Sequence, residues 1–282
     1  MSLTAARSDP ALLACPVVRD PLPAPPERTR PVLSARLLGG FWVTIDHVAV
    51  PLGTSRRTRA LLAFLIDRGG RPIPRDVLME AFWPASTPDA ARNSLHVAMC
   101  GVRKALAQVW AGVVIECRGD TYRLSDEIDV WTDVTELERR FDQAALVSSE
   151  GRTGDAIADY EAALALYGGD FLADDPYLEW ALGRREELRL RAVTCGERLS
   201  ELHLERGDLQ RSLVVATQVL REEPCHEPVA RRMMVAYARL GQPHMALRQY
   251  DRIVEVLGRE LGVAPAPETV DLAEAIRARR EI

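Results

Sequence analysis

The spacing of apolar side chains predicts that the first part of the chain combines short strands with three helices. Residues 34–52 (SARLLGGFWVTIDHVAVPL) are rich in branched and aromatic side chains and are interrupted at Gly39-Gly40 and Asp46-His47, which predicts two short antiparallel strands with turns. Apolar residues then recur at intervals of three and four, which predicts helices over residues 55–70, 74–83 and 92–106.

A β-hairpin is predicted directly after the third helix. The segments VVIEC and DTYRLS lie around Arg118-Gly119-Asp120, a sequence that favours a tight turn. Thr87 is a candidate N-cap for the third helix, with Pro88 at the first helical position. The order strands, helix, helix, helix, hairpin is typical of a winged helix-turn-helix with an additional N-terminal sheet, which is a DNA-binding arrangement.

From about residue 130 onward, the pattern predicts helices almost throughout. The segments 204–213 (LERGDLQRSL) and 238–247 (ARLGQPHMAL) align with Gly207 on Gly241, and their offset of 34 residues is the tetratricopeptide period. A third copy places Gly151 at the same position with an offset of 56, so about 22 residues are inserted there, and residues 167–180 are the candidate. Stacked helix pairs of this kind usually form a surface for partner proteins.

These predictions divide the chain into three parts. Residues 1–31 contain seven prolines and are interpreted as a disordered leader. Residues 32–127 are predicted to form the winged-helix domain and residues 128–282 the helical domain. The predicted fold class is mostly α with a small β component, a winged helix-turn-helix domain followed by an all-α tetratricopeptide-like helical repeat domain.

The distribution of charge supports this division. The whole chain has a net charge of -5, but residues 30–128 sum to +4 and residues 129–282 to -9. A basic block followed by an acidic block indicates two modules with different partners.

Several other features exclude classes of protein. The five cysteines are odd in number and none are at C-x-x-C spacing, which indicates a reduced, cytoplasmic protein without a disulfide scaffold or zinc site. No segment approaches the ~18 apolar residues that a membrane span needs. The histidines show no ligand spacing, and there is no Walker-type phosphate loop or G-x-S-x-G motif, so we expect no metal, no cofactor and no enzyme activity. Four tryptophans are interpreted as core residues: Trp42, Trp83, Trp131 and Trp180.

The third predicted helix has two unlike faces. Ala91, Leu95, Ala98, Val102 and Leu106 form its inward stripe. The opposite face contains no acid and carries Asn93, His96, Val97, Cys100 and Lys104, with Arg92 and Arg103 beside it. In a major groove, asparagine pairs with adenine, histidine donates to a base or phosphate, lysine contacts phosphate, and small apolar groups meet a thymine methyl. The alternative is a merely solvated face, but the winged-helix order favours contact with DNA.

Four further arginines are candidate DNA contacts. Arg118 and Arg123 bracket the hairpin turn, and an arginine on a wing is suited to the minor groove or the phosphate backbone. Arg56 and Arg57, together with Arg59, lie at the start of the first helix, where they oppose its dipole, and a nearby phosphate would relieve that cost. A solvated hairpin and a solvated helix start remain the alternatives.

Eight segments together carry a family resemblance. Those of the first module are LLGGFWV, RRTRALLAFLIDRGG, RDVLMEAFWP, ARNSLHVAMCGVRKAL and GDTYRL. Those of the second are YGGDFLADDPYLEW, HEPVARRMMVAYARLGQPHMALRQYDRI and LGRELGVAPAPET. In this order they resemble the Streptomyces antibiotic regulatory protein family, in which an OmpR-type winged helix is joined to a bacterial transcriptional activator domain. The likeness covers roughly residues 34–276.

The resemblance implies a transcription factor, its partners and a contact for one of them. Such a protein would bind direct repeats in double-stranded promoter DNA and recruit RNA polymerase holoenzyme through the winged-helix module, with the loop PASTPDA as a candidate polymerase contact. The helical module would mediate self-association or regulation. Two other functions remain open, namely a repressor with the same fold and a tetratricopeptide-type scaffold for protein interactions.

Overall fold

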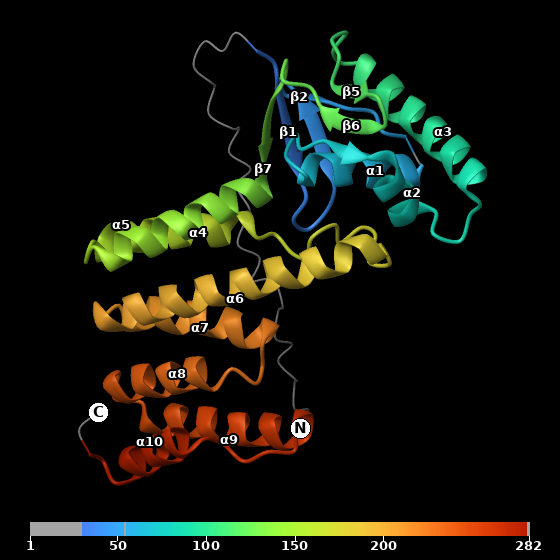
Figure 1. Cartoon of the computed structure of the whole chain (residues 1–282). Coiled ribbons are helices and arrows are strands. Elements are labelled where there is room, and N and C mark those ends of the chain that lie inside the picture. The colour runs from blue at the N-terminus through green and yellow to red at the C-terminus, as the bar shows by residue number, and fades with distance from the viewer. Residues whose placement is uncertain (1–29, 54, 281–282) are drawn as a thin grey trace, which may run out of the picture. The chain divides into compact units, whose positions relative to one another are not determined.

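The computed structural model describes residues 30–53 and 55–280, and residues 1–29 of the predicted leader lie outside the described residues (Figure 1). The first module contains β1 (Val32–Arg36), β2 (Trp42–Ile45), β3 (Val48–Ala49), α1 (Arg56–Asp67), β4 (Ile73–Pro74), α2 (Arg75–Phe82), α3 (Pro88–Ala107), β5 (Ile115–Arg118), β6 (Thr121–Leu124) and β7 (Asp129–Thr132). The second contains α4 (Asp133–Ser149), α5 (Thr153–Leu166), the short 3-10 helix η1 (Glu179–Ala181), α6 (Leu182–Glu205), α7 (Leu209–Glu222), α8 (Glu227–Arg239), α9 (Pro243–Glu260) and α10 (Pro267–Arg277). The predicted fold class is confirmed.

Two small sheets frame the helices of the first module. One has the strand order β3-β2-β1-β7, with β1 antiparallel to β2 and parallel to β7, and the other has the order β4-β6-β5. The pattern of residues 34–52 predicted β1 and β2 but missed β3, and the short strands β4 and β7 elsewhere in the chain were not predicted either. β3 and β7 are the two edge strands of the first sheet. The domain border after residue 127 stays a prediction, and β7, which follows it, pairs with a strand of the first module.

The core interpretation of Trp42 is wrong, because its side chain is 60% exposed. Val43 and Ile45 of the same strand are buried, and side chains alternate between the two faces of a strand, so Trp42 lies on the outer face of the sheet. It stands opposite Arg36 of β1 in the antiparallel register.

Helix α1 occupies the centre of the first module. Seven consecutive residues, Ala60 through Ile66, are buried, so the helix is covered on all sides rather than along one stripe. Its N-cap is Ser55, whose Oγ accepts from the Thr58 backbone N–H at 3.3 Å. α1 packs against α3, which fixes the recognition-type helix to the core of the module.

The internal repeat corresponds to three helix pairs, α4–α5, α6–α7 and α8–α9. Gly151, Gly207 and Gly241 end the first helix of each pair with φ of 75°, 79° and 74°. At each turn the glycine N–H donates to the carbonyl three residues before it, and the next N–H donates to the carbonyl five residues before its own position. Glycine accepts this left-handed conformation without a Cβ penalty, which is why it recurs at the turn.

The insertion between the first and second helix pairs joins the two modules. We call residues 167–178 the connecting segment; it lies between α5 and η1. Its Leu172 N–H donates to the Leu37 carbonyl at 2.7 Å, and the Gly39 N–H donates to the Asp170 carbonyl at 3.0 Å. The segment is therefore bonded to the loop that follows β1.

Gly39 is required for this close approach. Its φ is +80°, and a Cβ at this position would stand 2.6 Å from the Gly168 carbonyl oxygen. Both the backbone conformation and the lack of space exclude a larger residue.

A continuous apolar cluster runs from the first module into the second. Phe171 has no exposed surface, and Trp180 contacts both Phe64 of α1 and Phe82 of α2, with ring centroids 4.9 and 6.1 Å apart. The cluster extends from Leu33 to Val215. None of the helices in the described ranges has the length and hydropathy that crossing a bilayer requires.

Candidate nucleic-acid interface

Helix α3 has the buried stripe that its sequence predicts. Ala91, Leu95, Ala98, Val102 and Leu106 are all buried, and Pro88 occupies the first turn as expected. Gly101 is placed where α1 approaches, since a Cβ there would lie 3.2 Å from the Thr58 Oγ1. The helix is therefore held from one side only, and in Figure 1 it lies at the edge of the first module.

The opposite side of α3 is exposed. We call the side chains of Asn93, His96, Val97, Cys100 and Lys104 the exposed α3 face, and all five are open to solvent, as are Arg92 and Arg103 next to them. Val97 is 70% exposed in spite of its apolar character. No acid occurs between residues 90 and 107, so nothing on this part of the helix repels a polyanion.

The polar groups of the exposed α3 face are mostly uncommitted. Within the part of the chain that the structure describes, the side chains of Asn93 and Lys104 make no hydrogen bond or ion pair. His96 and Cys100 contact each other, with Nε2 3.7 Å from Sγ. These groups are available to an external ligand.

The two flanking arginines have weak internal partners. Arg92 lies 3.5 Å from the Asp89 carboxylate one turn earlier, with both side chains mostly exposed. Arg103 donates to the Ile115 carbonyl of β5 at 3.3 Å, which brings the end of α3 beside the hairpin.

The hairpin forms as predicted, and its two arginines differ in their exposure and partners. β5 and β6 pair from Ile115 with Leu124 to Arg118 with Thr121, and Gly119 in the turn has a φ of +58°. The Arg118 side chain is 74% exposed and pairs with the Glu116 carboxylate at 3.1 Å.

Arg123 is 22% exposed and is held between Glu116 and Asp126 at 3.0 and 2.7 Å. The hydrogen bond that Arg123 donates to the Glu116 carboxylate is the largest cause that raises the pKa of Arg123. Arg118 thus stays largely exposed at the wing tip with an ion pair to Glu116, whereas Arg123 braces the hairpin.

Arg56 and Arg57 are exposed at the start of α1. Arg57 also stacks over the Trp83 ring, with its guanidinium carbon 5.5 Å from the centroid. The first turn contains no acid to offset the opposing helix dipole. Thr58, the residue after Arg57, faces Gly101 of α3, so the start of α1 contacts the helix that carries the exposed α3 face.

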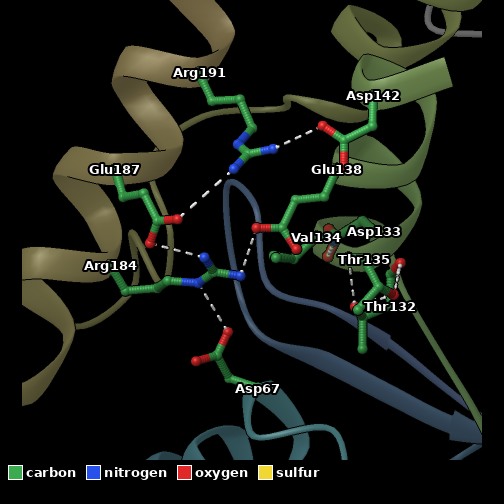
Figure 2. A network of polar contacts seen from close by, with 10 residues as sticks. All are labelled: Asp67, Thr132, Asp133, Val134, Thr135, Glu138, Asp142, Arg184, Glu187 and Arg191. Carbon is green, nitrogen blue, oxygen red and sulfur yellow. Dashed lines mark hydrogen bonds and ion pairs between the residues drawn. The ribbon is translucent and has the colours of Figure 1, made fainter. Parts of the chain in front are cut away.

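A second set of polar residues joins the two modules, and the sequence did not predict their contacts. Arg184 of α6 contacts three carboxylates, Asp67 of α1 at 3.2 Å, Glu138 of α4 at 2.9 Å and Glu187 at 2.9 Å (Figure 2). Burial raises the pKa of Asp67, and the charge of Arg184 opposes this shift in part. Figure 2 shows residues from three helices converging on one guanidinium.

Asp133 fastens the start of α4 to the first module. Its buried carboxylate accepts from the Leu37 N–H at 2.8 and 3.0 Å, the Leu38 N–H at 3.0 Å and the Val134 N–H at 2.9 Å. Burial raises the pKa of Asp133 and outweighs these hydrogen bonds, which lower it. We call the contacts of Arg184, Asp133 and the connecting segment the module junction.

Asp174 of the connecting segment also belongs to the module junction, although its side chain is 55% exposed. It accepts from the Phe41 N–H at 3.1 Å and from Arg59 at 3.2 Å. The sequence signals for this region were the adjacent glycines 39 and 40 and the interrupted repeat, but neither shows that the two segments meet.

Comparisons with known proteins agree with this architecture. A family profile described as "Bacterial transcriptional activator domain" matches residues 132–277, and one described as "Transcriptional regulatory protein, C terminal" matches residues 50–124. The transcriptional regulatory protein EmbR of Mycobacterium tuberculosis is 29% identical over 245 residues, which are 85% of this chain and 62% of EmbR. The chain therefore spans about three-fifths of the length of that relative.

Two Streptomyces proteins are also similar. The regulatory protein AfsR of Streptomyces griseus is 30% identical over 81% of this chain and 23% of AfsR. The regulatory protein DnrI of Streptomyces peucetius is 26% identical over 79% of this chain and 84% of DnrI.

A solved structure of M. tuberculosis EmbR, in complex with a low affinity phosphopeptide, superposes with a TM-score of 0.76 at 26% identity. The match covers 89% of this chain and 66% of that one. The winged-helix order, the helix pairs and these matches agree along nearly the whole described chain. The chain belongs to the bacterial transcriptional activator domain family, in the Streptomyces antibiotic regulatory type in which this domain follows an OmpR-type DNA-binding domain.

Proposed function

We propose that this protein is a sequence-specific activator of transcription that reads promoter DNA with the exposed α3 face. The observation that carries the proposal is the acid-free, solvent-open side of α3 with uncommitted Asn93 and Lys104 side chains. A 20-residue helix held from one side by a winged-helix core is suited to the major groove.

Each residue of the exposed α3 face has a proposed role. Asn93 pairs with an adenine, and His96 donates to a base or a phosphate. Val97 and Cys100 meet thymine methyl groups, and Lys104 neutralises a phosphate. Arg92 and Arg103 add phosphate contacts at the margins of the face, because their internal partners are weak.

The remaining arginines would contact the DNA backbone. Arg118 extends from the wing tip toward the minor groove or a phosphate, and its exposure supports this role. Arg123 would have to exchange two carboxylates for phosphate, so its direct contribution is smaller. Arg56 and Arg57 would hold a phosphate at the start of α1.

The primary test is a gel-shift titration of the full chain on duplex DNA from upstream of its own gene. The expected result is tighter binding than to random duplex of equal length, with protected bases in a repeated pattern on footprinting. Equal affinity for both duplexes at the same salt concentration contradicts the proposal, because sequence-independent binding depends on phosphates alone.

Activation, RNA polymerase contact and self-association on direct repeats are the finer parts of the proposal. Membership of the family supports them, and residues 84–90, which form the loop before α3 and the first turn of that helix, are the candidate polymerase contact. A promoter-reporter strain separates activation from repression, since deletion of an activator lowers reporter output and deletion of a repressor raises it.

The scaffold function is tested in the full chain. Removal of the first module would expose the apolar cluster that both modules share, so a truncated chain is not informative. A partner protein that remains bound to the Asn93→Ala and Lys104→Ala variants, in a chain with no specific DNA binding, supports the scaffold instead.

A further inference from the structure

His96 and Cys100 of the exposed α3 face form a pair of side chains that can both bind a metal, although the sequence predicted no metal site. They are four residues apart on one helix, and the His96 Nε2 lies 3.7 Å from the Cys100 Sγ. Side chains at this spacing lie one above the other on the same helix face. Two ligands at i and i+4 of one helix are also the arrangement that binds zinc in H-E-x-x-H sites.

The distance between the two donor atoms fits a shared metal ion. In a tetrahedral zinc site the metal–sulfur bond is about 2.3 Å and the metal–nitrogen bond about 2.0–2.1 Å. At a tetrahedral angle these bonds separate sulfur and nitrogen by about 3.5 Å. The 3.7 Å found here therefore requires a movement of only a few tenths of an ångström to close on an ion.

The surroundings define the kind of site. Both side chains are exposed, so an ion reaches them without any opening of the fold. Among the described residues, no three His, Cys, Asp or Glu side chains are grouped to hold a metal, so water would complete the coordination. Thiolate and imidazole together select zinc-like, thiophilic cations over Mg²⁺ or Ca²⁺.

We propose that His96 and Cys100 form an exchangeable two-ligand site for a thiophilic divalent cation, Zn²⁺ or Cd²⁺. Neutral His96 supplies its Nε2 lone pair while the Nδ1 keeps the proton. Cys100 loses its thiol proton to solvent as the sulfur–metal bond forms, so binding releases one proton and transfers no electron. This site differs from the closed structural zinc site that the cysteine spacing excludes.

Metal binding at His96 and Cys100 would regulate DNA binding, an inference that rests on the proposed function. The atoms that hold the ion are the same atoms proposed to meet base edges, and the hydrated ion occupies the space between α3 and the groove floor. Metal and specific DNA would therefore compete, and by linkage each weakens the binding of the other by the same factor.

The first test is made without DNA. The reduced full-length protein is titrated with Cd²⁺ while thiolate-to-metal charge-transfer absorbance and proton release are followed. The wild type is expected to show a one-equivalent transition with proton release. Cys100→Ser is expected to abolish it and His96→Gln to weaken it about tenfold or more, because each removes one of two protein ligands.

The matched control is Cys117→Ser, which removes another exposed thiol, one that lies 3.6 Å from the Gly119 carbonyl oxygen. This variant is expected to keep the transition. The proposal is overturned if Cys100→Ser gives the same titration curve as the wild type, or if the wild type shows no transition. His96 and Cys100 would then form a thiol–imidazole hydrogen bond and no metal site. Both ligands are exposed, so the variants are expected to fold, and their circular dichroism checks this.

The second test adds DNA. Each protein's affinity for its specific duplex is measured with and without Zn²⁺ and compared with its own metal-free value. Zn²⁺ is expected to lower the affinity of the wild type and of Cys117→Ser for the specific duplex about tenfold or more, which is the effect of losing one base contact. A chelator is expected to restore the affinity. The ratio is expected to be near one for Cys100→Ser. If the metal binds but DNA affinity does not change, the competition is refuted and the metal site is not. If the protein binds no duplex specifically, the proposed function is refuted instead.

Discussion

The exposed α3 face and the module junction are both rich in polar side chains, but they differ in how these groups are satisfied. At the junction, Arg184 contacts three carboxylates, and Asp133 accepts three backbone N–H groups. On the exposed α3 face, Asn93 and Lys104 have no internal side-chain partner in the described ranges. The two regions contain similar polar groups, which have internal partners at the junction and lack them on the exposed α3 face of the described structure.

The difference indicates a division of labour. A buried charged group costs several kcal/mol unless it is paired, so the satisfied groups of the junction serve to hold the modules together. An exposed group without a partner costs little in water and remains free to bind a ligand. Variants at the junction should therefore change stability, and variants of the exposed α3 face should change binding.

The largest effect is expected for Phe171→Ala in the connecting segment. Phe171 has no exposed surface, and truncation of a buried phenylalanine costs about 3–5 kcal/mol in the free energy of unfolding. Urea unfolding measures this loss. Tyr177→Ala, an 88% exposed aromatic residue of the same segment, is the control and is expected to change stability by about 0.5 kcal/mol or less. Equal losses from both variants would show that the segment does not pack as described.

Asp133→Ala is expected to cost about 3 kcal/mol of stability, because it leaves buried backbone N–H groups without an acceptor. Asp142→Ala on the same helix is the matched control, since this carboxylate is 73% exposed and makes one long ion pair with Arg191. It is expected to cost less than about 1 kcal/mol. If the folded Asp133→Ala protein prefers different bases from the wild type, the junction affects DNA recognition as well as stability, contrary to expectation.

Asn93→Ala is expected to cost about 1–3 kcal/mol of binding free energy at one base pair, while the free energy of unfolding is unchanged. The measurement is a series of operator duplexes with single base-pair substitutions. Gln108→Ala, at the exposed end of α3, is the control and is expected to bind all duplexes as the wild type does. Uniform weakening on every duplex would assign Asn93 to phosphate rather than to a base.

Lys104→Ala is expected to have the smallest effect. It should weaken binding about equally on all duplexes and lower the slope of log affinity against log salt by about 1. The unaffected control is Arg252→Ala, an exposed base of α9. A loss confined to one sequence would mean that Lys104 reads a base edge.

Local patterns predicted much of this protein. The stripe of α3, the glycine turn of the hairpin and the three glycine-centred helix pairs were all predicted, because each depends on neighbours within a few residues. Strands β3 and β4 were missed because two residues show no period, and β7 because it forms by pairing with β1, almost 100 residues earlier in the chain. Trp42 was assigned to the core because composition does not show which face of a strand is covered.

The amino-acid sequence by itself determined the two kinds of module, their order and the acid-free side of α3. Only the tertiary structure decided that Arg118 stays exposed while Arg123 is held between two carboxylates, and that His96 and Cys100 come within 3.7 Å. It also decided that residues 167–178 bond to the loop after β1, more than 120 residues earlier in the chain. Contacts of this kind depend on how distant elements pack, and no local periodicity records them.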